Sequence, residues 1–275
     1  MTPRIPGTAI EIVEEPPRAS LRHALFDLDG TLSLLRDGWQ DQMVPLMVEL
    51  LEDCGQDEPP AELEKLVTGF VDQLTGKQTI YQMIRLCEEI EKRGGAPLAP
   101  LEYKELYNER LDAAISNRLE AVRGGRLPRE DFLVPGSMAL LENLVGRGVR
   151  CYLASGTDEE LVRRDAALLK FDHLFEGGIF GALRRYESFS KRQVIERIIA
   201  EHQLNGPELI VIGDGFVEIQ NGREAGAVTF GVHSPENNRY HMNSGKRERL
   251  LEAGAHFLAP GLEDGAALLD HLRVD

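Results

Sequence analysis

The stretch HALFDLDGT, residues 23–31, places a short apolar run directly before two carboxylates and a glycine. The run His23 to Phe26 is typical of a buried strand, and Asp27 and Asp29 follow at its carboxyl end. In open α/β sheets, sites form outside the carboxyl ends of the strands. Two carboxylates there suit a nucleophile, a proton-transfer group and a hard cation. An acidic turn without catalytic function could contain the same residues, so this stretch alone does not distinguish a catalytic site from a plain turn.

A second acidic turn follows a second apolar run. Residues 209–212, LIVI, have the composition of a fully buried strand, and Gly213-Asp214-Gly215 ends it, with Glu218 four residues after Asp214. Carboxylate oxygens at strand ends are ligands that Mg²⁺ prefers, together with water and substrate phosphate. The alternative is a plain Gly-Asp-Gly turn with a solvated glutamate.

Two further segments carry groups that suit an anion. Ser155-Gly156-Thr157 follows an expected strand over residues 149–154. A hydroxyl and free backbone N–H groups at the start of a helix form an anion pocket, although Thr157 is also expected to cap that helix. Lys191 is expected early in a later helix, where an ordinary surface lysine is the alternative.

Periodicity divides the chain into two kinds of structure. Apolar residues recur at helical spacing near residues 44–51, 63–74, 80–90 and 101–122, which predicts a small helical bundle without strands. From about residue 135, strands alternate with helices, which predicts a parallel sheet covered on both faces. The helical block therefore interrupts an α/β pattern after its first strand. Residues 9–13 are expected to add an edge strand. Trp39 is expected to be a core aromatic, with a position at the hinge of the helical block as the alternative.

Composition narrows the class of protein. The chain has 31 Lys and Arg against 46 Asp and Glu, a net charge of −15, which argues against a nucleic-acid binder or a membrane-surface binder. No apolar stretch approaches the ~20 residues of a membrane span, and no signal peptide is evident. Cys54, Cys87 and Cys151 form neither a disulfide framework nor a zinc motif, which suits the cytoplasm.

The order of the four segments is more specific than any of them alone. Asp-x-Asp-Gly-Thr, strand-Ser, Lys and strand-Gly-Asp resemble the four motifs of the haloacid dehalogenase superfamily, in particular its phosphatase-like members with a helical cap inserted after the first motif. The resemblance covers residues 21 to about 270. It implies a Rossmann-like core over 21–36 and 133–275, a four-helix cap over 37–132, and an N-terminal extension over 1–20.

The resemblance also implies roles for individual residues. Asp27 is the expected nucleophile, and Asp29 the general acid and later the general base. Mg²⁺ is expected on Asp27, Asp214 and the backbone carbonyl of Asp29. Ser155 and the N–H of Gly156 are expected to hold phosphoryl oxygens, and Lys191 to neutralise the transferring group.

Three further residues are expected at or near the site. Glu218 stands where the family usually has an aspartate, so it is expected at the metal site either directly or through water. Lys77, between two cap helices, is expected to reach the site and read the leaving group, with a solvated lysine or a Schiff base as alternatives. Thr31 is expected to contact substrate.

These expectations together describe a Mg²⁺-dependent phosphatase that acts on a small phosphorylated metabolite through an aspartyl-phosphate, as a monomer or homodimer. A haloacid dehalogenase proper is disfavoured, because those members lack an acid at the position of Asp29. A sugar phosphomutase, a phosphonate hydrolase, and a weakly active binding or regulatory protein on the same scaffold remain alternatives.

Overall fold

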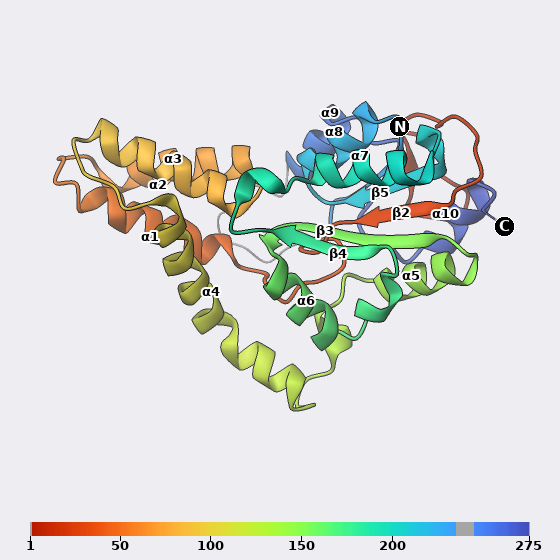
Figure 1. The fold of residues 1–275 in the computed structure, drawn as a ribbon, viewed down its shortest axis with the longest axis horizontal. Helices are drawn as coiled ribbons and strands as arrows, with labels where there is room; N and C mark the ends of the chain where they lie inside the picture. Colours follow the sequence, from red (N-terminus) through yellow and green to blue (C-terminus); the bar gives the residue numbers. More distant parts are fainter. Residues whose placement is uncertain (1, 235–244, 275) are drawn as a thin grey trace.

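The computed structural model describes residues 2–234 and 245–274 and has a sheet domain with a helical insert (Figure 1). The sheet has the strand order β1-β7-β6-β5-β2-β3-β4, in which β1 is antiparallel to β7 and the other neighbours are parallel. The strands are β1 (Glu11–Ile12), β2 (His23–Phe26), β3 (Arg150–Asp158), β4 (Gly178–Ala182), β5 (Leu209–Gly213), β6 (Val228–Val232) and β7 (Phe257–Ala259). The expected α/β fold with a mostly parallel sheet is confirmed.

Helices cover both faces of the sheet because alternate strand residues are apolar on both sides. In β2, Ala24 and Phe26 pack with α5, α6 and α10 on one face, whereas Leu25 packs with α7 on the other. Helices α8 and α9 pack together beside β7. The helices of this domain are α5 (Ser137–Gly146), α6 (Glu159–Leu168), α7 (Lys191–His202), α8 (Phe216–Glu224), α9 (Lys246–Glu252) and α10 (Gly265–His271).

The insert between β2 and β3 is helical, as predicted, and projects away from the sheet (Figure 1). Its helices are α1 (Gln40–Glu52), α2 (Pro60–Leu74), α3 (Thr79–Lys92) and α4 (Pro100–Arg123). The chain leaves and re-enters the sheet domain at adjacent points: Leu34 N–H donates to the carbonyl of Phe132, and Val134 N–H donates to that of Leu32. The exact limits of a cap domain stay a prediction.

The N-terminal segment is attached to the sheet edge. Glu11 lies opposite Leu258 in the antiparallel pair of β1 with β7, and Ala9 N–H donates to Asp264 Oδ2 at 2.7 Å. The edge strand expected over residues 9–13 is therefore present, although it is only two residues long. Among the described residues, no helix combines the length and apolarity that a bilayer span requires.

Candidate active site

Strand register brings the predicted segments together at one edge of the sheet. Phe26 lies opposite both Leu153 of β3 and Ile212 of β5, so the residues that follow all three strands are neighbours. Asp27 N–H donates to the carbonyl of Ile212 at 3.0 Å, which extends the β2–β5 pairing into the motif. The site therefore lies outside the carboxyl ends of the strands, as parallel sheets require.

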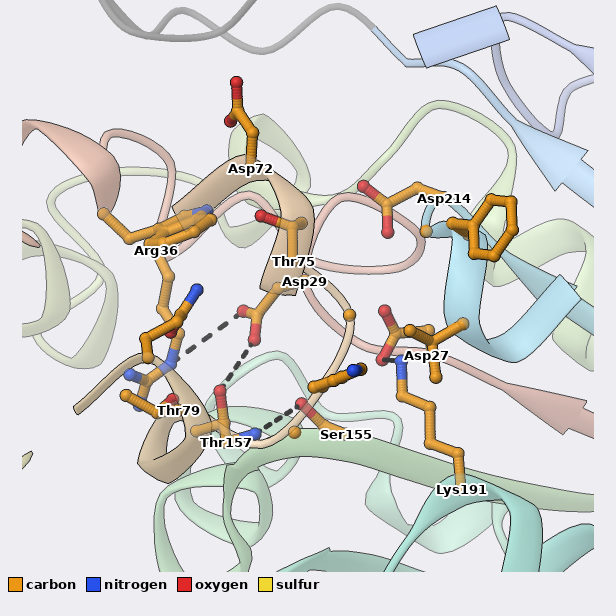
Figure 2. A pocket seen from close by; sticks show the side chains of 18 of the residues that line it. Asp27, Asp29, Arg36, Asp72, Thr75, Thr79, Ser155, Thr157, Lys191 and Asp214 are labelled. Carbon is orange, nitrogen blue, oxygen red and sulfur yellow. Dashed lines mark hydrogen bonds and ion pairs between the residues drawn. The ribbon is translucent and has the colours of Figure 1, made fainter. Parts of the chain in front are cut away.

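A cavity of about 490 Å³ opens there, with walls from both the sheet domain and the insert. Figure 2 shows Asp27, Asp29, Lys191 and Asp214 around it, with Thr75 and Thr79 from the cap side. The predicted catalytic, substrate-binding and metal-binding residues that line the cavity are Asp27, Asp29, Lys77, Ser155, Gly156, Lys191 and Asp214.

Three carboxylates form an acidic cluster at the base of the cavity. One oxygen each of Asp27, Asp214 and Glu218 lies within 4.8 Å of the others. Lys191 Nζ is 2.9 Å from Asp27 Oδ1 and 2.9 Å from Glu218 Oε2, and Lys246 Nζ is 2.7 Å from Asp214 Oδ2. When all three carboxylates are ionised, they exceed the two ammonium groups that contact them among the described residues by one negative charge. The all-oxygen donor set fits Mg²⁺.

Burial governs the protonation of the cluster. It raises the pKa of Asp27 well above the ordinary value, and the charge of Lys191 opposes that rise while Glu218 adds to it. Burial lowers the pKa of Lys191, but the charges of Asp27 and Glu218 outweigh this effect and the net pKa is raised. Lys191 therefore keeps its charge, and further positive charge at the cluster would favour the ionised form of Asp27.

Asp29 faces the cavity from the other side and has different partners (Figure 2). Thr157 Oγ1 donates to Asp29 Oδ2 at 3.1 Å, and Arg36 Nε lies 3.9 Å from Oδ1. Burial raises the pKa of Asp29 to about 6, with the charge of Arg36 opposing the rise. A carboxyl group in this range can both give and accept a proton near neutral pH.

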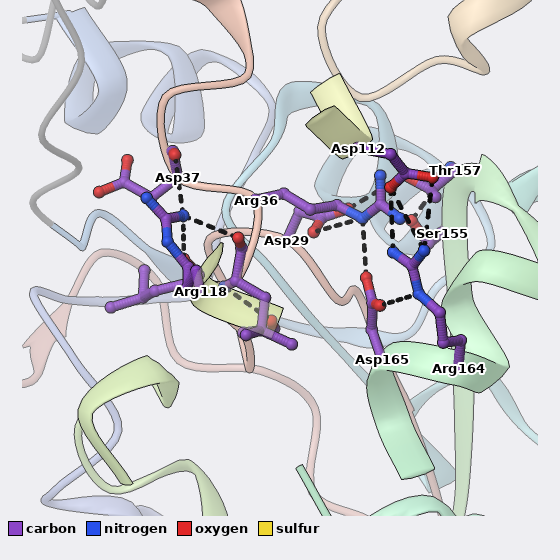
Figure 3. Close-up of polar contacts among 12 residues, drawn as sticks. Asp29, Arg36, Asp37, Asp112, Arg118, Ser155, Thr157, Arg164 and Asp165 are labelled. Carbon is purple, nitrogen blue, oxygen red and sulfur yellow. Dashed lines mark hydrogen bonds and ion pairs between the residues drawn. The ribbon is translucent and has the colours of Figure 1, made fainter. Parts of the chain in front are cut away.

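A buried ion pair holds Arg36 beside Asp29 (Figure 3). Arg36 Nε donates to Asp165 Oδ2 at 2.9 Å, and the two side chains are 5% and 0% exposed. Arg164 Nε donates to the other oxygen of Asp165 at 2.8 Å. In the same view, Arg118 of α4 donates to the carbonyl of Leu35, which fixes the linker that leads into the insert.

The segment 155–157 differs from its expected form. It lies within β3, whose register with β4 shifts after Ala154, and not at a helix start. The prediction that Thr157 caps the helix is wrong: α6 begins at Glu159 after Asp158, and no described side chain caps it. The Thr157 hydroxyl instead donates to Asp29, and its N–H donates to Ser155 Oγ at 3.1 Å.

The remaining predicted residues lie at different depths. Lys77 has an exposed side chain at the cavity rim. Glu218 is 1% exposed behind the wall, where its Oε1 accepts from Gly215 N–H at 2.6 Å. Thr31 is fully buried beneath the motif, and its hydroxyl has no hydrogen-bond partner among the described residues, so the structure does not bring it to the cavity. Trp39 precedes α1, is half-buried against the main apolar core, and also lines the cavity.

The sequence also predicts that the loop 233–238, which follows an apolar run, borders the pocket. Its residues 235–238 lie outside the described part of the chain.

Sequence reasoning missed several polar residues of the site. Arg36, Asp165 and Lys246 belong to no motif, and each becomes important only through a contact that folding creates. Thr157 had a visible signal, because it follows Ser155 by two residues, but helix capping was an equally good explanation.

Comparison with known proteins agrees with this architecture. A parallel sheet with two aspartates after an internal strand, and a helical insert over them, defines a capped α/β enzyme. The chain belongs to the haloacid dehalogenase-like hydrolase family, whose sequence model matches residues 21–226. No curated protein sequence matches the chain.

Solved structures with the same fold have low sequence identity. A predicted phosphoglycolate phosphatase from Haemophilus somnus is 16% identical with a TM-score of 0.59, over 92% of this chain and 99% of that one. The β-phosphoglucomutase of Clostridium difficile is 16% identical with a TM-score of 0.62, over 92% and 97%. A phosphonoacetaldehyde hydrolase-like protein from Oleispira antarctica is 15% identical with a TM-score of 0.58, over 94% and 95%.

Proposed function

We propose that the protein is a Mg²⁺-dependent phosphatase that hydrolyses a small phosphorylated metabolite through an aspartyl-phosphate. The observation that carries the proposal is that two aspartates line one cavity but have different charged and polar neighbours. Asp27 contacts Lys191 beside two further carboxylates, whereas Asp29 contacts a hydroxyl and lies near a guanidinium. Two carboxyl groups in such different environments suit two different chemical tasks.

In the first step, an oxygen of Asp27 forms a bond to phosphorus while the bond from phosphorus to the leaving oxygen breaks. Asp29 gives its proton to that leaving oxygen, and its raised pKa of about 6 keeps a proton available. Lys191, 2.9 Å from Asp27, neutralises charge on the phosphoryl group. Ser155 and the N–H of Gly156 hold phosphoryl oxygens.

In the second step, Asp29 takes a proton from water, the water oxygen bonds to phosphorus, and the bond from phosphorus to Asp27 breaks. Inorganic phosphate leaves and both aspartates return to their starting states. Hydrolysis in two steps replaces one difficult displacement by two easier ones.

The acidic cluster would hold the cation through Asp27 and Asp214, with the backbone carbonyl of Asp29 as the third protein ligand. When bound, Mg²⁺ supplies positive charge that offsets the repulsion between the Asp27 carboxylate and the phosphoryl group. Both oxygens of Glu218 already have partners, Gly215 N–H and Lys191. This supports a role for Glu218 in orienting the turn and the lysine rather than in direct ligation.

Phosphonate hydrolysis is less well supported. Its Schiff-base step needs a desolvated lysine, and the Lys77 side chain is exposed. A phosphomutase would show itself by transfer of phosphate to an added sugar phosphate instead of to water.

The test is a screen of sugar, nucleotide and glycolate-type phosphates, with and without Mg²⁺. We expect phosphate release that requires Mg²⁺, and its loss in Asp27→Asn. The matched control is Asp72→Asn, because Asp72 lines the same cavity outside the acidic cluster. Turnover retained in Asp27→Asn would refute the nucleophile, and absence of turnover across the panel would favour a binding protein.

A further inference from the structure

The turn between α2 and α3 places a buried amide across the boundary between insert and sheet domain. Gln78 is 4% exposed, and its Nε2 donates to the carbonyls of Tyr186 at 2.9 Å and Phe189 at 2.7 Å. Those carbonyls belong to the segment that connects β4 to α7. In Figure 1, this segment extends from the sheet toward α3. Both N–H donors of one side chain thus engage the sheet domain.

The rest of the same turn, residues 75–78, packs against the walls of the active site, and we call it the cap turn. Gly76 has a φ of +89°, and a Cβ there would come within 3.3 Å of Val217 and 3.5 Å of Glu218 Oε2. A Cβ on Gly156 would lie 2.5 Å from the carbonyl oxygen of Lys77. The backbone of the turn is therefore packed directly against β3 and α8.

The segment that Gln78 contacts leads straight into the proposed catalytic lysine. Phe189 is followed by Ser190, whose Oγ accepts from Gln193 N–H at 3.1 Å and caps α7. Lys191 is the first residue of that helix, and its ammonium group contacts Asp27 and Glu218. Because only Ser190 separates Phe189 from Lys191, a shift of the Phe189 carbonyl moves the start of α7 and with it Lys191.

We propose that Gln78 is a positioning residue that links the seated cap turn to the placement of Lys191. The inference rests on the proposed function, in which Lys191 neutralises charge on the phosphoryl group. If Gln78 loses its donors, the buried carbonyl of Phe189 loses its side-chain partner, and the carbonyl of Tyr186 keeps only the Phe189 N–H at 3.3 Å. The entry to α7 and the cap turn then loosen together. The enzyme then keeps the Lys191 ammonium group beside Asp27 only while the cap turn is packed against the sheet domain. Closure over the substrate and neutralisation of the phosphoryl charge therefore occur together.

Other contacts hold the insert in place without Gln78. Lys104 and Asn108 of α4 both contact the carboxylate of Asp158, the latter through Nδ2 at 2.9 Å. Tyr81 and Tyr186 also pack edge to face, with ring centres 5.9 Å apart. A change at Gln78 is therefore expected to loosen one turn without detaching the insert.

The experiment compares wild type with Gln78→Met, which keeps the side-chain size and removes the donors, and Gln78→Glu, which places acceptors against two carbonyls. The control is Gln56→Met, because Gln56 Nε2 donates to the carbonyl of Arg93 within the insert at an exposed position. Activity is measured as kcat and KM for p-nitrophenyl phosphate with Mg²⁺. Backbone amide exchange is measured over residues 75–80 and 186–193.

We expect kcat to fall roughly ten- to a hundred-fold in Gln78→Met, and further in Gln78→Glu, with a smaller change in KM. Exchange should rise in both segments together and stay unchanged elsewhere, and Gln56→Met should match wild type. Exchange that rises over 75–80 alone, or over the whole chain, would overturn the link, as would an unchanged kcat. If wild type itself lacks turnover, the proposed function fails, and the exchange measurement still decides whether the two segments are linked.

Discussion

The side chain of Glu218 is one methylene longer than the aspartate that the family resemblance leads one to expect. Its extra length lets Oε1 reach back to Gly215 N–H while Oε2 contacts Lys191. One carboxylate thus fixes both the turn that carries Asp214 and the ammonium group beside Asp27. The sequence showed that the substitution exists, but only the contacts show which groups it holds.

Protonation of His23 gives a prediction away from the site. His23 begins β2 at the opposite end from Asp27, and its Nδ1 lies 3.1 Å from Tyr152 Oη, which lies 2.9 Å from His202 Nε2. Burial lowers the pKa of His23 from 6.5 to about 4, with the charge of His202 adding to the effect. The neutral form is therefore favoured in the folded state.

Stability linked to His23 is fully present above pH 6.5 and is lost as the pH falls toward about 4, because the unfolded chain takes up the proton first. We expect the urea midpoint of wild type to fall across this range more steeply than that of His23→Gln. Exposed His173 supplies the control variant, His173→Gln, which should follow wild type. Equal slopes for wild type and His23→Gln would contradict the assignment.

At the scale of elements, periodicity was sufficient for the helices of the insert and for the alternation of strands and helices. Alternate residues of β2 and β5 are apolar toward both faces, and this composition is visible in the sequence. The extension of β3 through Ser155, Gly156 and Thr157 was not predictable, because polar residues in a strand end look like a turn. The pairing with β4 is interrupted after Ala154 and resumes at Asp158, and Gly156 lies against the backbone of the cap turn.

Contacts between elements were the part of the site that the sequence could not supply. Arg36 and Asp165 meet across the linker and α6, and Lys246 reaches Asp214 from α9. Ion pairs between residues so distant along the chain leave no local pattern. The motif residues Asp27, Asp29, Lys191 and Asp214, by contrast, were identifiable because each follows a strand or starts a helix.

Packing of β3 against the cap turn gives a prediction at this scale. In Gly156→Ala, the new methyl group would lie 2.5 Å from the carbonyl oxygen of Lys77, so the turn must move. Overpacking of this kind costs about 1–3 kcal/mol. We expect a raised KM for an aryl phosphate and faster amide exchange over residues 75–80. Gly69→Ala is the control, because its Cβ has no neighbour within 4 Å in the middle of α2.

The opposite result would be informative for the same variant. A Gly156→Ala protein with wild-type KM and unchanged exchange in the turn would mean that the contact is not maintained in solution.

At the scale of the whole molecule, the net charge of −15 describes the surface more than the site. The cavity is lined by carboxylates and by three cations, Lys191, Lys246 and Arg36. Each of these cations is at most 5% exposed. A small anion can therefore find local positive charge in a protein that repels extended polyanions. Residues of the insert form part of the cavity wall, so we expect the insert to limit which leaving groups fit.

Cation binding should be measurable as stability of the whole chain. A ligand that binds the folded state stabilises it by RT ln(1 + [L]/Kd), or about 2.7 kcal/mol at a hundredfold excess over Kd. We expect Mg²⁺ to raise the thermal midpoint of wild type and chelation to reverse the rise. Asp214→Asn should abolish this response, whereas Glu252→Gln, at the cavity rim outside the cluster, should retain it. An equal response in Asp214→Asn would place the cation elsewhere.

The most direct test of the account is acid quench during turnover of a phosphomonoester, followed by mass spectrometry of tryptic peptides. The peptide from His23 to Arg36 contains both aspartates of the motif. The account predicts a phosphoryl adduct on Asp27 that accumulates with substrate and Mg²⁺ and is absent in Asp27→Asn. Turnover with no adduct on this peptide, or with the adduct on another residue, would contradict it.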